Sequence, residues 1–180
     1  MIKAKLKSLV REQRGFTLIE LLVAIAITAS VTGAIATTLY QVIIGNAQGS
    51  NHITAVRQVQ NAGYWITRDG QQAQVIIDGD DSATVGVTEF LVLSWVDWTA
   101  ATSNRVAYTI IGNELHRSLS INGGAAVETT VARFINVNPA DTNVTLNGNV
   151  ITLTVTATVD GFPRIINETR EYQIVPRPSL

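Results

Sequence analysis

The longest apolar stretch of the chain covers residues 16–44 and contains one side chain that is charged at neutral pH, Glu20. A membrane-spanning helix needs about 20 consecutive apolar residues, so residues 16–40 are long enough to cross a bilayer. Backbone polar groups in lipid must be hydrogen-bonded within their own segment, which favours a helix. We therefore expect residues 16–40 to form a transmembrane helix.

Basic side chains cluster before this segment, and the next Lys or Arg along the chain is Arg57. The cluster consists of Lys3, Lys5, Lys7, Arg11 and Arg14. Because Lys and Arg gather on the cytoplasmic side of membrane helices, the N-terminus is expected in the cytoplasm and the residues after the helix outside it. Beyond the cluster, acidic residues outnumber basic ones, which argues against contact with nucleic acid.

The carboxylate of Glu20 has two interpretations that do not exclude each other. An acid within a membrane segment is costly to insert, so it indicates a function and a partner of opposite charge. Thr17 and Glu20 also match a capping box, in which the two residues bond each other's backbone at the start of a helix. A secretory signal peptide cleaved near residues 24–26 or 34–36 is an alternative, although the apolar run is longer than such peptides have.

The sequence GFTLIELLVAIAI, preceded by the basic leader MIKAKLKSLVREQR, resembles the N-terminal signature of type IV prepilins and type II secretion pseudopilins. The resemblance implies that a prepilin peptidase cleaves after Gly15 and methylates the new N-terminal residue, Phe16. It also implies that Glu20 pairs with the amino group of Phe16 on a neighbouring subunit. Cleavage would create an ammonium group in an apolar setting, where a nearby carboxylate would neutralise it.

This resemblance further implies a structural, non-enzymatic subunit of a type IV pilus or a type II secretion pseudopilus, of the minor pilin or minor pseudopilin kind. Its partners would be the prepilin peptidase, other pilin or pseudopilin subunits, an inner-membrane assembly platform and membrane lipid. The subunit would sit in the cytoplasmic (inner) membrane as a single-pass protein before it enters an extracytoplasmic filament. The alternative is a singly anchored binding module outside the cytoplasm that does not polymerise.

Four segments are expected along the chain: a leader at 1–15, the transmembrane and polymerisation helix at 16–40, an amphipathic continuation of that helix at 41–77, and a β-sheet domain at 78–180. In the third segment, apolar or small residues such as Val59, Gly63 and Ile66 recur every three or four positions, the period of one helix face. The expected fold is α+β and pilin-like, with the long helix packed on one antiparallel sheet.

Strands are predicted where the apolar period changes to two. The predicted strands cover residues 88–98, 105–119 with a turn at Gly112 and Asn113, 131–137, 150–159 and 169–175. In 150–159, apolar residues alternate with threonines, which predicts one buried face and one wet face. The tryptophans Trp65, Trp95 and Trp98 are expected in the core or at its rim.

No catalytic constellation is found in the sequence. Cysteine is absent, and His52 and His116 lack a second metal ligand at zinc-site spacing. The acidic run at Asp78, Asp80 and Asp81 offers hard oxygen ligands for Ca²⁺, but it lacks the spacing of an EF-hand loop. We expect no cofactor, with Ca²⁺ as a weak candidate there, and a solvated turn is the favoured interpretation.

Overall fold

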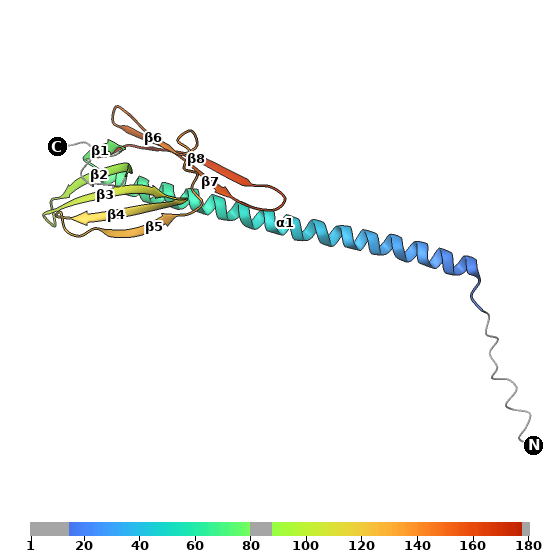
Figure 1. Ribbon diagram of the computed structural model, residues 1–180. Helices are drawn as coiled ribbons and strands as arrows, with labels where there is room; N and C mark the ends of the chain where they lie inside the picture. Colours follow the sequence, from blue (N-terminus) through green and yellow to red (C-terminus); the bar gives the residue numbers. More distant parts are fainter. Residues whose placement is uncertain (1–14, 80–87, 178–180) are drawn as a thin grey trace, which may run out of the picture. The chain divides into compact units, whose positions relative to one another are not determined.

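The computed structural model describes residues 15–79 and 88–177 of the chain (Figure 1). Compact packing divides the chain into two units, Met1–Ile44 and Gly45–Leu180, and each is described by itself. The helix α1, Leu18–Gln72, contributes its first part to one unit and its second part to the other. The leader charges Lys3 to Arg14 lie outside the described residues.

The first part of α1 is apolar and exposed. Every residue from 15 to 43 is exposed, including large side chains such as Leu18, Ile25 and Ile35. One helix of the described residues, α1, is long and apolar enough to cross a membrane. Hydroxyl groups in this part donate to the carbonyl four residues earlier, as Thr28 does to Ala24 at 2.8 Å. Each such hydroxyl is satisfied inside the helix and needs no water.

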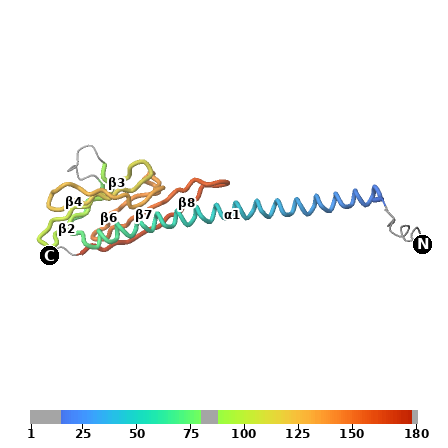
Figure 2. Tube along the Cα trace, turned by 90° about the horizontal axis from the view of Figure 1, so that it is seen from below, coloured from blue at the N-terminus to red at the C-terminus, as the bar shows by residue number. Residues whose placement is uncertain are grey.

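The second part of α1 has one covered face, as the period of its apolar residues predicts. The buried residues are Ala55, Val59, Ala62, Gly63, Ile66, Asp69 and Gly70. This face lies against both β-sheets: Gly63 and Gly70 meet β8, while Asp69 meets β3 and β4. Figure 2 shows this part of α1 running beside β7 and β8.

The helix ends earlier than the predicted residue 77. It stops at Gln72, where the N–H of Ala73 donates to the carbonyl of Gly70 at 3.2 Å, and β1, Val75–Asp78, follows. Two β-branched isoleucines follow Val75, and their backbone groups pair with β2 instead of continuing the helix. The prediction that Ile77 belongs to the helix was therefore wrong.

Five antiparallel strands form the larger sheet in the order β1-β2-β3-β4-β5. The strands after β1 are β2, Glu89–Asp97; β3, Thr102–Ile111; β4, Glu114–Ile121; and β5, Val127–Ala132. The predicted hairpin at Gly112 is confirmed, with Gly112 at a φ of 62°. The strand predicted at 131–137 was misplaced, because β5 ends at Ala132 and only Ile135 makes a further bridge, to Ala157.

Three further antiparallel strands form a second sheet, β6-β7-β8, so the single predicted sheet is two sheets. Their bounds are β6, Asn143–Asn147; β7, Val150–Val159; and β8, Ile166–Ile174. The strand predicted at 150–159 is confirmed, whereas β6 was not predicted. Among the described residues β8 pairs with β7 alone, so it belongs to the second sheet and not to the single sheet that was predicted.

A single core joins the second part of α1 to both sheets, and the predicted α+β class with antiparallel strands is confirmed. Tyr108, Ile66, Leu93 and Leu153 are among its fully buried side chains. Trp65 and Trp95 pack against this core as predicted. Trp98 does not, because it lies in the turn after β2 and is exposed.

Candidate functional site

The start of α1 is built by Thr17 and Glu20. The backbone N–H and the hydroxyl of Thr17 both donate to Oε2 of Glu20, at 2.9 Å and 2.8 Å, and the N–H of Glu20 donates to the Thr17 hydroxyl at 3.3 Å. These are the reciprocal bonds of a capping box, which satisfy N–H groups that have no partner inside the helix. The capping interpretation of Glu20 is confirmed.

The cap leaves Glu20 able to act as a charge as well. Both Thr17 bonds end on Oε2, and Oε1 takes part in none of the hydrogen bonds found among the described residues. Glu20 and Phe16 are exposed, with Phe16 at 84%. Gly15 is also open, since a Cβ built on it would meet nothing within 4 Å. The carboxylate and the residues on both sides of the expected cleavage point are therefore accessible to a partner.

The apolar surface around Glu20 extends along the first part of α1. Leu18, Ile19, Leu22 and Val23 are 81%, 65%, 57% and 47% exposed. Exposed apolar area on this scale exceeds what soluble monomers carry and marks a surface that meets lipid or other protein. The site thus combines one carboxylate, bonded to the Thr17 hydroxyl, with a wide apolar surface.

The structure describes only part of the acidic run proposed for Ca²⁺. Asp78 is the last residue of β1 and is exposed, while Asp80 and Asp81 lie outside the described residues. Within 15–79 and 88–177, no group of three His, Asp or Glu side chains is placed to hold a metal ion. Ca²⁺ binding at this run stays a prediction.

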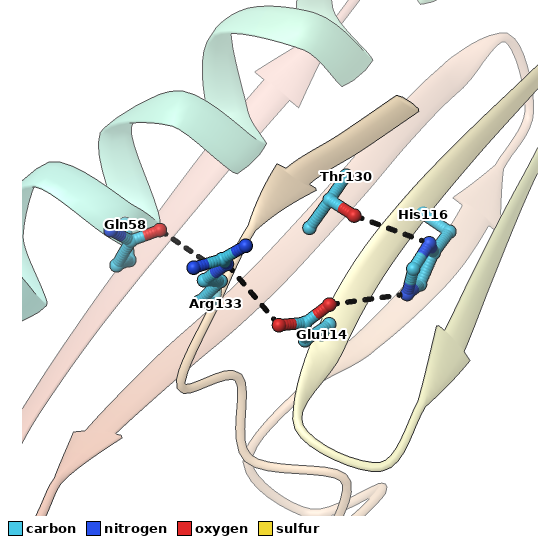
Figure 3. Close-up of polar contacts among 5 residues, drawn as sticks. All are labelled: Gln58, Glu114, His116, Thr130 and Arg133. Carbon is cyan, nitrogen blue, oxygen red and sulfur yellow. Dashed lines mark hydrogen bonds and ion pairs between the residues drawn. The ribbon is translucent and has the colours of Figure 1, made fainter. Parts of the chain in front are cut away.

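His116 belongs to a surface cluster on β4 and β5 (Figure 3). Glu114 lies between two basic residues, with Oε1 3.2 Å from Nε of Arg133 and Oε2 3.6 Å from Nε2 of His116. The Thr130 hydroxyl is 3.4 Å from Nδ1 of His116, and the backbone N–H of Arg133 donates to Oε1 of Gln58 at 2.7 Å. The last bond ties the residue after β5 to α1.

A buried ion pair connects α1 to the larger sheet. Nε and Nη2 of Arg117 donate to Oδ2 and Oδ1 of Asp69 at 2.6 Å and 3.2 Å, and the hydroxyl of Tyr108 donates to Oδ2 at 2.7 Å. The guanidinium also lies 5.1 Å from the centroid of the Trp65 ring. The carboxylate is therefore held by two hydrogen-bond donors in one plane and a hydroxyl, which is the arrangement that a buried charge requires.

The pKa values of two groups reflect this burial. Desolvation raises the pKa of the Tyr108 phenol, and the negative charge of Asp69 raises it further. Burial by itself would lower the pKa of Arg117, but its hydrogen bonds to Asp69 and the charge of that carboxylate outweigh burial and raise it. Tyr108 thus stays a hydrogen-bond donor and Arg117 stays charged at neutral pH.

Sequence analysis missed Asp69, although a signal was present. Asp69 lies three residues after Ile66 on the apolar face of α1, and a charged residue at such a position implies a buried partner. The partner could not be identified from sequence, because Arg117 is 48 residues away.

Comparison with known proteins gives one match. Residues 10–36 match the family model described as the prokaryotic N-terminal methylation motif. No curated protein and no solved structure matches the chain. The matched segment contains Gly15, Phe16 and Glu20, and it ends within the exposed first part of α1.

Proposed function

We propose that this chain, whose N-terminus is of the prepilin type, is a structural subunit of a type IV pilus or a type II secretion pseudopilus. The observation that carries the proposal is the methylation motif at residues 10–36, in register with a capped helix whose exposed surface is apolar. A motif of this kind implies in general a prepilin peptidase and other pilin-like subunits as partners. It also agrees with a membrane-anchored precursor.

Processing after Gly15 would make Phe16 the first residue of the mature chain, N-methylated and positively charged. An ammonium group at that position needs a counter-charge, because the helix that follows is apolar for more than 20 residues. Glu20 of a neighbouring subunit supplies it in this proposal. Oε1 of Glu20 would receive the ammonium, while Oε2 keeps its two bonds to Thr17.

The exposed apolar surface supports a two-stage use of the helix. Residues 16–40 first lie in the cytoplasmic membrane, with the basic leader on the cytoplasmic side. The same side chains then pack against the helices of other subunits in the filament, with the assembly platform acting during that transfer. The role is structural and not enzymatic, and the strand-rich unit after residue 45 favours a minor pilin or minor pseudopilin.

N-terminal mass spectrometry of the protein purified from its native membrane tests the processing step. The expected mature chain begins at N-methylated Phe16. A chain that begins at Met1 would instead favour a tethered module that does not polymerise. A start after Ala26 or Ala36 would indicate an ordinary secreted domain, and either result would overturn the proposal.

The variant Gly15→Ala provides a second test of cleavage after residue 15. Apart from its chain neighbours, no described residue has an atom within 4 Å of a Cβ built at residue 15, so the substitution is expected to leave the helix and membrane insertion intact. Cleavage should nevertheless fail, because the peptidase must approach the backbone at this position closely. Normal processing of Gly15→Ala, scored by the mass of the N-terminal peptide, would contradict recognition of a prepilin junction.

A further inference from the structure

A polar hollow lies at the C-terminal end of α1, where the larger sheet extends beyond the helix. Leu91, Leu93 and Trp95 alternate on the face of β2 that packs toward the core, and Asp97 continues this row. The helix stops at Gln72, so it does not cover the end of the row. The space left there is about 370 Å³ and is lined by Gln72, Gln74, Trp95, Asp97, Trp98 and Arg177.

These lining residues come from three separate parts of unit Gly45–Leu180: the end of α1 with the residues just after it, the end of β2 with the turn that follows it, and the segment after β8. The same three parts lie at one end of the sheets in both views (Figure 1 and Figure 2). A hollow assembled from distant segments is positioned by the fold, as ligand sites in proteins usually are.

Trp98 is an exposed wall of this hollow, at 76%. Its turn is held by Asp97, whose Oδ1 accepts hydrogen bonds from the N–H groups of Thr99 at 2.9 Å and Ala100 at 3.2 Å. Ala101 closes the turn with a φ of 52°, a value that non-glycine residues adopt only when the surroundings impose it. An exposed indole on an ordered turn is a flat apolar surface that is already in place for a ligand.

The polar groups of the hollow are both donors and acceptors. Oε1 of Gln74 accepts a hydrogen bond from the N–H of Val96 at 3.2 Å, which fixes the orientation of the amide. The NH₂ group of the same amide takes no part in this bond and is a donor for a ligand. Gln72 offers a second amide, Trp95 a second indole, and Asp97 and Arg177 one charge of each sign. The site therefore carries no net charge, and it has several hydrogen-bonding groups beside two aromatic rings.

We propose that this hollow binds a neutral oligosaccharide. A sugar ring has an apolar face of C–H groups. This face stacks on an indole because the face of the aromatic ring carries negative partial charge. Its hydroxyl groups both donate and accept, as amide, carboxylate and guanidinium groups together require. A phosphate or a polyanion would meet Asp97, and a purely apolar ligand would leave the amides without partners.

Binding at this site goes beyond the proposed structural function and does not depend on it. The test uses the full chain in micelles of a detergent without a sugar headgroup, such as lauryldimethylamine oxide. The probes are chitotetraose, cellotetraose and maltotetraose, titrated by calorimetry and by tryptophan emission, with a tetrasaccharide of hyaluronan as the anionic comparison. We expect at least one neutral probe to bind with a dissociation constant on the order of 1 mM or below, as for a small open site.

Variants at Trp98 show whether the indole carries the binding. Trp98→Ala is expected to weaken it roughly tenfold, equivalent to about 1.4 kcal/mol. Trp98→Tyr should retain most of the affinity, because it keeps an aromatic surface. Tyr64→Ala is the matched control, since Tyr64 is 61% exposed and lines a different groove, between α1 and β8. Trp98 is exposed, so these variants are expected to fold as the wild type does.

Three results would overturn the proposal. The first is no heat and no emission change with any neutral probe at concentrations well above the expected constant. The second is binding that survives unchanged in Trp98→Ala or is lost equally in Tyr64→Ala. The third is binding of the hyaluronan tetrasaccharide alone, which would assign the hollow to an anionic ligand held by Arg177.

Discussion

The two parts of α1 have the same backbone structure but opposite surroundings. From residue 18 to residue 43 every side chain is exposed, whereas between Ala55 and Gly70 one face is buried in the core. Other parts of the same chain cover the buried face, and the charged residue on this face has an ion-pair partner within the chain. The exposed part is apolar and is not satisfied by the chain, so it needs lipid or other subunits.

This contrast separates two kinds of substitution. A change in the buried face should alter the free energy of unfolding of unit Gly45–Leu180 and leave processing unaffected. A change in the exposed part should alter processing or assembly and leave that free energy unaffected. The following experiments test whether the two kinds of substitution have these separate effects.

Asp69→Ala is expected to have the largest effect on stability. It leaves the guanidinium of Arg117 buried without a counter-charge, and removing one partner of a buried pair costs about 3–5 kcal/mol. Urea unfolding, followed by tryptophan emission, to which Trp65 beside Arg117 contributes, measures the change. Asp78→Ala removes an exposed carboxylate and should stay within about 0.5 kcal/mol. Equal behaviour of the two variants would contradict the buried pair.

Glu20→Gln tests whether the exposed part needs the charge or only the cap. Glutamine can accept the same bonds from Thr17, so the helix start should be kept while the carboxylate charge is lost. We expect incorporation into filaments to fall at least tenfold, or by about 1.4 kcal/mol or more per subunit, because the Phe16 ammonium remains unpaired.

The comparison for Glu20→Gln is Thr17→Ala, which removes the hydroxyl bonds of the cap and keeps the charge. Thr17→Ala should assemble better than Glu20→Gln, and both should match the wild type in urea unfolding of unit Gly45–Leu180. Quantifying the subunit in filaments sheared from cells measures assembly. Wild-type assembly of Glu20→Gln would leave capping as the whole role of Glu20.

Gly63→Ala should have a smaller effect on stability. A Cβ at residue 63 would overlap the ring of Tyr172, whose hydroxyl donates to the carbonyl of Val59 at 3.1 Å. Overpacking of this kind costs about 1–3 kcal/mol. Gly49→Ala, on the same helix with nothing within 4 Å of the added Cβ, should instead be neutral or stabilise by up to about 1 kcal/mol. Thermal unfolding of both variants would show the difference, and equal midpoints would argue against close packing at Gly63.

Glu114→Gln should have the smallest effect. Its ion pair with Arg133 lies at the surface, where Arg133 is 64% exposed, and exposed pairs contribute about 1 kcal/mol or less. The small loss should shrink further in high salt, which screens exposed charges. Urea unfolding at low and high salt measures both effects. If the free energy of unfolding fell as much as in Asp69→Ala, the cluster in Figure 3 would be a major contributor to the stability of the fold, which would contradict its description as a surface ion pair.

The elements that sequence analysis predicted well have a strong local signal. Val150–Val159 alternates apolar residues with threonine over its whole length, and the strand has these bounds. The hairpin turn at Gly112 follows from a residue that adopts positive φ easily. The start of α1 follows from Thr17 and Glu20 at the spacing of a capping box. Each of these signals lies within about ten residues of sequence.

The elements that were missed or misplaced have weak or conflicting local signals. β1 has four residues, Val75–Asp78, that directly follow an amphipathic helix, and its pairing with β2 decides its conformation. β6 is five residues long, and it is held by its register with β7. The tryptophan prediction failed at Trp98 because this residue lies in the turn after β2 and is exposed, whereas Trp95 within the strand packs against the core.

The sequence by itself determined the cluster of basic residues before Phe16, the methylation motif at residues 10–36, the apolar segment with its single carboxylate, and the alternating strands. These features depend on charge, hydropathy and capping among near neighbours. Only the tertiary structure decided where α1 ends, how the strands of the described residues divide into two sheets, and that Asp69 meets Tyr108 and Arg117, which are 39 and 48 residues away. Such contacts depend on which distant segments pack together, because a buried charge or strand edge is stable only beside the partner that the fold provides.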